Sequence, residues 1–256
     1  MQVESSAQVA EQLAATGYLC DESLATVVFL AGRMQRPLLL EGEPGTGKTA
    51  LAEALAQVAG VPLLRLQCYE GIDASQALYD WDFPRQVLHL RALEAAGGLG
   101  GQGVEEAEKS LYDERFLLAR PVLAALQQAP AVLLVDEVDR ADDEFEAFLL
   151  EVLSDYTVSV PEIGTLHAKH IPLVFLTSNN AREMSDALKR RCLHLFLDYP
   201  SASRELEIVR SKKTGLSDQL AEELVNVVRG LRELELRKSP SISETRLRVP
   251  GRTSAR

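Results

Sequence analysis

The segment that most restricts the fold and the ligand of this chain is LLLEGEPGTGKT, residues 38–49. It runs from an apolar strand into a glycine-rich turn that ends in Lys48 and Thr49, and a helical pattern follows. Such a turn lets successive backbone N–H groups face one phosphate, while the lysine supplies a point charge and the threonine a hydroxyl ligand for Mg²⁺. The helix expected to open at Thr49 directs its positive dipole end at the same anion.

The segment therefore predicts a nucleoside triphosphate site, the alternative being an accidental glycine turn before a helix. We assign nucleotide contacts to Gly42, Glu43, Pro44, Gly45, Thr46, Gly47, Lys48, Thr49 and Ala50.

Length and composition favour a globular protein. With 256 residues, 46% hydrophobic and 25% charged, the chain can form one large domain, or one domain and a small appendage. The first residues lack a basic start followed by an apolar run, and no apolar run is long enough to span a membrane, so we expect a cytoplasmic location. The net charge of −11 disfavours a nucleic-acid binder.

The cysteines and histidines give no metal signature. Cys20, Cys68 and Cys192 lie far apart without a CxxC pair, which disfavours a zinc knuckle and a disulfide framework and favours reduced, packed side chains. His167 and His170 have a spacing that metal sites sometimes use, but no acidic or thiol partner is near them in sequence.

Apolar runs bounded by turn signals predict five buried strands, at residues 38–41, 62–67, 131–136, 171–178 and 193–197. Helical patterns alternate with them, so we expect an α/β fold with a mostly parallel sheet that helices cover on both faces. Ligands of such sheets bind beyond the carboxyl ends of the strands. The first, third and fourth strands should therefore bring their last residues to one crevice.

Other segments are expected to surround this sheet. Residues 156–160 and 164–167 flank a turn and predict a β-hairpin, and the glycine-rich residues 97–103 predict a surface loop after a helix at 87–96. Residues 203–212 and 217–236 have helical periodicity and predict a small helical lid, with a glutamate at capping distance after Ser201 or Ser203.

Two adjacent carboxylates, Asp136 and Glu137, leave the apolar third strand in AVLLVDEVDR. Asp136 can hold a magnesium-bound water, and Glu137 can polarise the water that attacks the γ-phosphate. Paired acids after a strand also serve as helix N-caps, but the upstream phosphate loop favours the functional interpretation.

The ends of two later elements carry further candidates. Asn179 follows the fourth strand and is our choice to orient a water near the γ-phosphate, with Asn180 as a capping residue or an alternate; an ordinary turn is the alternative. Arg190 and Arg191 finish a short helix before the fifth strand and suit charge stabilisation on a phosphoryl group. They could equally form a solvated helix end.

The order of these parts resembles the AAA+ ATPases. The segment DEVDRAD, the hairpin and the compact lid resemble the MoxR branch of this family. Two further segments, CYEGIDASQALYDWDFPRQ and DEFEAFLLEVLSDYTVSVPEIGT, are similar to the CoxD-type accessory ATPases within that branch. The resemblance implies a P-loop AAA+ domain at residues 1–200 and a lid at 201–245. Residues 246–256 form a basic, atypical tail, so the lid is expected to be incomplete.

The resemblance also implies roles for matching residues. Lys48 and Thr49 would take the phosphates of ATP or ADP and Mg²⁺, with Thr49 and Asp136 on the metal side. Glu137 would serve the hydrolytic water, Asn179 the sensor position, and Arg191, less surely Arg190, the finger that reaches a neighbour's nucleotide. Gly17 and Tyr18 fall in the region that lines the adenine pocket.

Members of the MoxR branch work as rings, commonly hexamers, and often pair with a protein that bears a von Willebrand factor A domain. CoxD-like members are associated with metal insertion into carbon monoxide dehydrogenase-type molybdenum enzymes, so a client metalloenzyme is implied.

The chain departs from the family at its end. Ser241 stands where many lids carry an arginine, with Lys238 as a substitute, and residues 237–256 carry a net charge of +5. This favours a second hypothesis, a nucleotide-gated protein-binding module with little hydrolysis. A small-molecule kinase is a third hypothesis, which lacks an evident acceptor motif. The aromatic residues Tyr79, Trp81 and Phe83 mark either a partner-facing insertion or core filling.

Overall fold

A five-stranded parallel sheet forms the centre of the molecule, in the order β2-β5-β8-β1-β9. The computed structural model describes residues 3–95, 109–127, 130–211 and 217–233. The strands are β1 (Leu38–Glu41), β2 (Leu63–Gln67), β5 (Val132–Asp136), β8 (Leu173–Ser178) and β9 (Leu193–Phe196). The predicted α/β fold with five strands is therefore confirmed, and the strand boundaries differ from the prediction by at most two residues. The prediction that all five strands are buried is wrong for β2 and β9, which are partly exposed because they form the two edges of the sheet.

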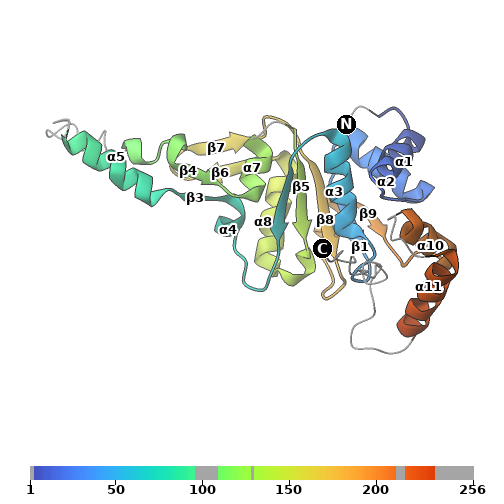
Figure 1. Cartoon of the computed structure of the whole chain (residues 1–256). Coiled ribbons are helices and arrows are strands. Elements are labelled where there is room, and N and C mark those ends of the chain that lie inside the picture. Colours follow the sequence, from blue (N-terminus) through green and yellow to red (C-terminus); the bar gives the residue numbers. More distant parts are fainter. Residues whose placement is uncertain (1–2, 96–108, 128–129, 212–216, 234–256) are drawn as a thin grey trace, which may run out of the picture.

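Helices cover both faces of this sheet (Figure 1). One group is α1 (Ser6–Ala15), α2 (Glu22–Met34) and α3 (Lys48–Ala59), and the other is α7 (Pro121–Gln127), α8 (Asp143–Asp155) and α9 (Asp186–Arg191). Because successive side chains of a strand point to opposite faces, Leu38 and Leu40 pack with the first group while Leu39 packs with the second. These two apolar layers hold the strand ends in fixed positions.

Polar side chains cap the first turns of several helices. Side chains of Ser5, Asp21, Asp142 and Ser185 accept backbone N–H bonds at the starts of α1, α2, α8 and α9. Helix α3 begins at Lys48 rather than at Thr49, directly after Gly47 in the left-handed region. Asn180 was predicted as a possible cap, but Ser185 caps the following helix.

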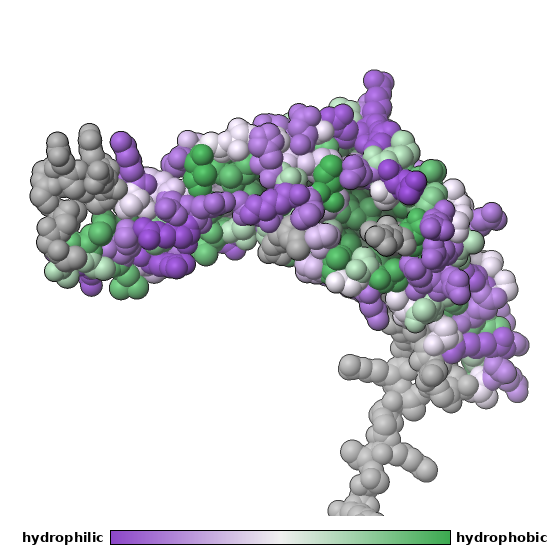
Figure 2. Space-filling model, turned by 90° about the horizontal axis from the view of Figure 1, so that it is seen from above, coloured by the Kyte–Doolittle hydropathy of each residue, from purple (hydrophilic) through white to green (hydrophobic). Residues whose placement is uncertain are grey.

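An arm leaves the body beside β2, formed by α4 (Ala74–Leu78), β3 (Tyr79–Trp81), α5 (Phe83–Ala95), a 3₁₀ turn η1 (Glu114–Phe116) and β4 (Leu117–Ala119). Figure 1 shows α5 projecting away from the sheet, and Figure 2 shows green, hydrophobic surface along the arm between purple patches. Tyr79 and Trp81 pack partly against the core, whereas Phe83 is 62% exposed. Tyr79 and Trp81 thus help to fill the core, and a partner-facing role for the exposed Phe83 stays a prediction.

The predicted hairpin is present as β6 (Thr157–Val160) and β7 (Gly164–His167). Tyr156 does not belong to it, because it ends α8 in the left-handed conformation with φ 52°. The helix predicted at 87–96 is α5, which begins earlier, at Phe83. The predicted glycine loop at 97–103 lies outside the described residues.

Two helices, α10 (Ala202–Ser211) and α11 (Asp218–Glu233), pack on each other in the region predicted as a lid. The buried Glu205 forms a two-bond ion pair with Arg232, at 2.8 Å each. Glu205 is therefore not a capping residue; the Ser201 hydroxyl accepts the Arg204 N–H instead. Residues 234–256, with Lys238, Ser241 and the basic tail, lie outside the described part, so the domain boundaries stay predictions. Within the described part, no helix has the length and apolar character needed to cross a bilayer.

Candidate nucleotide site

The glycine-rich loop between β1 and α3 has the conformation that its sequence predicts. Gly42, Gly45 and Gly47 have φ values of 148°, 83° and 97°, in a region that residues with a Cβ rarely adopt. A Cβ added to Gly42 would lie 2.1 Å from the Leu197 carbonyl oxygen. The loop can therefore pass the segment after β9 only with glycine at this position.

Lys48 is buried beneath the loop. Its Nζ donates to the carbonyl oxygens of Gly42 at 2.6 Å and Glu43 at 2.8 Å. Burial lowers the pKa of this ammonium, and the nearby carboxylates, Asp139 first, oppose the shift. The ammonium thus lies inside the loop, where a phosphate group would compensate its charge.

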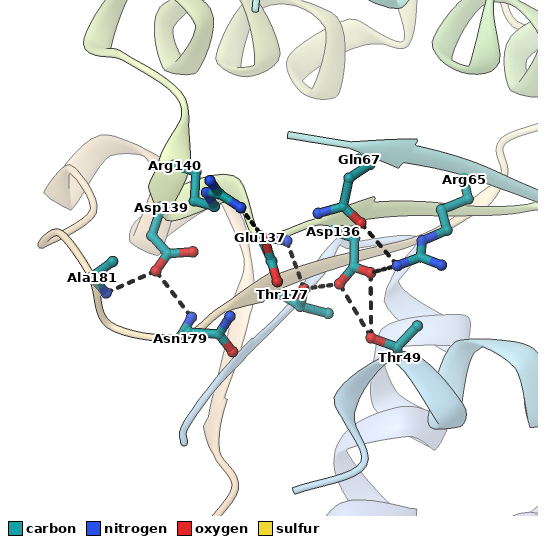
Figure 3. A network of polar contacts seen from close by, with 10 residues as sticks. All are labelled: Thr49, Arg65, Gln67, Asp136, Glu137, Asp139, Arg140, Thr177, Asn179 and Ala181. Atoms are coloured by element: carbon teal, nitrogen blue, oxygen red, sulfur yellow. Dashed lines mark hydrogen bonds and ion pairs between the residues drawn. The ribbon is translucent and has the colours of Figure 1, made fainter. Parts of the chain in front are cut away.

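Asp136 at the end of β5 faces the first turn of α3 (Figure 3). The Thr49 hydroxyl lies 3.2 Å and 3.4 Å from the two carboxylate oxygens of Asp136. A hydroxyl beside a buried carboxylate is a set of hard oxygen donors that suits Mg²⁺, directly through the threonine and through bound water at the aspartate. The two predicted metal-side residues therefore lie together and fit this ion.

Two further side chains contact the same carboxylate. Thr177 of β8 donates its hydroxyl hydrogen to Asp136, and Arg65 of β2 forms an ion pair with Asp136 at 2.5 Å. Arg65 also donates to Gln67 at 2.8 Å. Side chains from β2, β8 and α3 thus meet at Asp136 of β5, whose side chain is 5% exposed.

Glu137 follows Asp136 with φ 54°, in the left-handed region that non-glycine residues adopt at a cost. Its backbone N–H donates to the Thr177 hydroxyl at 2.9 Å, and its carboxylate pairs with Arg140 at 3.1 Å. The 3₁₀ turn η2 (Val138–Arg140) follows, and the Glu137 side chain makes no capping bond. The turn therefore presents the carboxylate at the cavity instead of capping a helix with it.

Asn179 is held by a residue of the same turn. The buried Asp139 accepts the backbone N–H of Asn179 at 3.1 Å and that of Ala181 at 2.8 Å. Figure 3 shows these bonds between the segment after β8 and the turn after β5. Asn180 has φ 59° and completes the bend. The predicted sensor residue thus has its backbone fixed relative to Glu137.

A cavity of about 1050 Å³ lies in front of these residues. Of the predicted residues it is lined by Gly17, Tyr18, Pro44, Gly45, Thr46, Gly47, Lys48, Thr49, Ala50, Asp136, Glu137 and Asn179. The Tyr18 ring lies 3.7 Å from where a Cβ on Gly47 would stand, and burial raises the pKa of its hydroxyl. Gly42 and Glu43 reach the site through their carbonyl bonds to Lys48.

Arg190 and Arg191 lie elsewhere. Both end α9 and line a separate depression of about 500 Å³ with Arg36 and Tyr156. Neither arginine lines the cavity of its own chain. Their predicted role in a neighbouring copy stays a prediction.

Sequence reasoning missed Arg65, Asp139 and Arg204. Arg65 was visible as a charge inside an otherwise apolar run, and Asp139 as the third acid of DEVDR. Arg204 of α10 gave no signal; it lines the cavity and donates to the Cys20 carbonyl at 2.5 Å. Cys20 is partly exposed beside it, while Cys68 and Cys192 are buried, and all three are free.

The fold and this site define the class of the P-loop AAA+ ATPases. Residues 37–192 match the family described as "AAA domain (dynein-related subfamily)", and the chain belongs to this family. The crystal structure of a proposed ATPase from Cytophaga hutchinsonii has the same fold, with a TM-score of 0.54 and 17% identity over 88% of this chain and 68% of that one.

Curated relatives support the same class. NirQ of Pseudomonas aeruginosa, a denitrification regulatory protein, is 25% identical over 86% of this chain and 76% of its own length. YehL of Escherichia coli is 28% identical over 77% of this chain and 54% of its own length. Midasin of Giardia intestinalis is 36% identical over 40% of this chain. The chain spans only 2% of midasin and about half of YehL.

Proposed function

We propose that the protein is a MoxR-type AAA+ ATPase that binds and hydrolyses ATP to remodel a client protein. The proposal that the protein hydrolyses ATP rests on the contact between Thr49 and Asp136 inside the cavity of about 1050 Å³. It joins the phosphate loop to the strand-end carboxylates, which is the arrangement that phosphoryl transfer to water requires.

Each side chain of the site would have its own role in binding or hydrolysing ATP. When bound, Mg²⁺ would neutralise charge on the β- and γ-phosphates, and Thr49 and Asp136 would hold it. Glu137 would accept a proton from the attacking water, and Asn179 would orient that water. Lys48 would exchange its bonds to the loop carbonyls for phosphate oxygens. Gly17 and Tyr18 would border the adenine.

Ring assembly would complete this site. Arg191, with Arg190 beside it, lies outside the cavity of its own chain, and a guanidinium stabilises a transferring phosphoryl group only at close range. We therefore assign both arginines to the nucleotide of an adjacent copy, in a ring that is commonly a hexamer in this branch.

The partners follow from the CoxD-like resemblance. We propose a cytoplasmic protein that acts with a von Willebrand factor A domain partner on a carbon monoxide dehydrogenase-like molybdenum enzyme, during maturation or metal insertion. The similarity to the regulatory protein NirQ is consistent with an accessory role. The exposed Phe83 and Leu88 on α5, 62% and 66% exposed, offer apolar surface to such a partner.

Steady-state release of inorganic phosphate from ATP tests the hydrolytic function. We expect hydrolysis per subunit to rise with protein concentration and Glu137→Gln to lower kcat by about two to three orders of magnitude while nucleotide still binds. Glu144→Gln, the same change at an exposed position of α8, is the control. Undiminished turnover by Glu137→Gln would contradict the proposal.

The same assay separates the other hypotheses. The nucleotide-gated binding module would be favoured by two results together. The protein would capture a partner only with ATP, and the wild type would hydrolyse ATP no faster than the Glu137→Gln variant. A phosphorylated small molecule in place of free phosphate would favour a kinase.

A further inference from the structure

Three arginines gather at the depression that lies apart from the nucleotide cavity. Arg36, Arg190 and Arg191 line it together with Tyr156, Pro37 and Leu153, and none of its lining residues is acidic. No ion pair of Arg190 or Arg191 occurs among the described residues, although the chain carries a net charge of −11. A cluster of this charge without counter-ions favours an anion from outside the chain.

Arg36 differs from the other two arginines because it binds within the chain. Its Nε donates to the Arg191 carbonyl oxygen at 3.1 Å, and its Nη2 donates to the Arg190 carbonyl oxygen. The last carbonyls of a helix have no partner inside the helix, and a cation there also complements the helix dipole. Arg36 thus satisfies the C-terminal end of α9 with one planar group.

This anchor matters because α9 has only six residues. A helix this short is unstable by itself, so its neighbours determine where its last side chains point. The adjoining backbone is also bound to the segment of Arg36, because the N–H of Leu193 donates to the Pro37 carbonyl at 2.8 Å. The residue before Arg36 is also held, because the Tyr156 hydroxyl donates to the Gln35 carbonyl at 3.1 Å.

We propose that Arg36 is a positioning residue for Arg190 and Arg191, which it aligns for a phosphate group held by the adjacent copy. The inference rests on the proposed function, in which these two arginines act in the neighbour's site. Arg36 itself reaches the reaction only through the backbone of α9. A lysine cannot replace it fully, because one ammonium lacks the fork that spans two carbonyls.

Complementation between two inactive full-length variants tests the inference. The Lys48→Ala chain keeps both arginines but does not bind nucleotide productively. The Arg191→Ala chain keeps its nucleotide site but lacks Arg191. We expect the mixture to hydrolyse ATP. Adding Arg36→Gln to the Lys48→Ala chain should lower kcat of the mixture at least tenfold with KM unchanged, and Arg36→Lys should recover only part of it.

The same change in the other chain is the internal control for folding. Arg36→Gln added to Arg191→Ala should leave the mixture active, because that chain only receives the arginine. Arg33→Gln in the Lys48→Ala chain, an equal charge change at an exposed position of α2, should also have no effect.

Equal loss from Arg36→Gln in both chains, or no loss in the Lys48→Ala chain, would overturn the positioning role alone. Failure of the parent pair to complement would instead overturn the shared-site part of the proposed function, and the role of Arg36 with it.

Discussion

Arg65 on the edge strand β2 forms an ion pair with Asp136 at the end of β5, with 2.5 Å between Nη2 and Oδ2. The guanidinium therefore binds one of the two carboxylate oxygens that lie beside the Thr49 hydroxyl (Figure 3). Half of the Arg65 side chain is exposed, whereas Asp136 is buried, so the arginine can withdraw while the carboxylate stays.

Removal of this cation should favour metal binding. Because Arg65 and Mg²⁺ compete for one carboxylate, Arg65→Gln is expected to lower the Mg²⁺ concentration for half-maximal binding of a fluorescent ATP analogue about three- to tenfold, a range set by a screened interaction between charges. Arg120→Gln, which removes an exposed arginine between β4 and α7 that pairs with Asp80, is the matched control. An unchanged or higher Mg²⁺ requirement in Arg65→Gln would contradict the competition.

Gly42→Ala tests the close approach of the phosphate loop to the segment after β9. The new Cβ would lie 2.1 Å from a backbone oxygen, at a φ of 148°, so the loop must move. We expect a loss of about 2–4 kcal/mol in the free energy of unfolding, measured by urea denaturation. Gly32→Ala in α2 meets nothing within 4 Å and should stabilise by about 0.5–1 kcal/mol. Equal stability of both variants would contradict the tight approach.

Cys20 provides a chemical probe of the cavity. It is partly exposed and lines the cavity, while Cys68 and Cys192 are buried, so a thiol reagent should modify one cysteine in the folded protein. Burial raises the pKa of Cys20, so labelling should be faster at pH 9 than at pH 8.

Saturating Mg·ATP should slow the modification of Cys20 at least tenfold by covering it, and Lys48→Ala should abolish this protection. If Mg·ATP left the rate of Cys20 modification in the wild-type protein unchanged, the nucleotide would bind elsewhere.

The buried Tyr156 predicts a loss of stability at alkaline pH. Burial, with the Cys192 thiol as a second cause, raises the pKa of its hydroxyl from 10.0 to about 12. Between these values the unfolded chain releases the proton and the folded chain keeps it, so the free energy of unfolding falls as the pH rises, by about 2 kcal/mol at pH 12.

Urea denaturation from pH 8 to pH 11 measures this effect. Tyr156→Phe should show a shallower decline than the wild type above pH 10, after a loss of about 1 kcal/mol at neutral pH from the missing bond to Gln35. Parallel declines in the two proteins would assign the alkaline sensitivity to other groups.

The sequence by itself determined the sheet and the phosphate loop. Apolar runs bounded by turn residues located all five strands within two residues. The central strands β1, β5 and β8 are buried on both faces and need a continuous apolar segment, and the partly exposed edge strands β2 and β9 still carry enough apolar residues to be found. The glycines and Lys48 of the loop were equally readable, because their spacing is local and their conformations depend on adjacent residues.

Only the tertiary structure decided which further side chains contact the predicted site residues. Arg65 meets Asp136 across 71 positions, Asp139 meets Ala181 across 42, and Arg36 meets the Arg191 carbonyl across 155. These contacts arise because the strand order β2-β5-β8-β1-β9 places segments side by side that are far apart in the chain. Local propensity contains no information on such pairs, since the energy that forms them comes from packing the whole sheet.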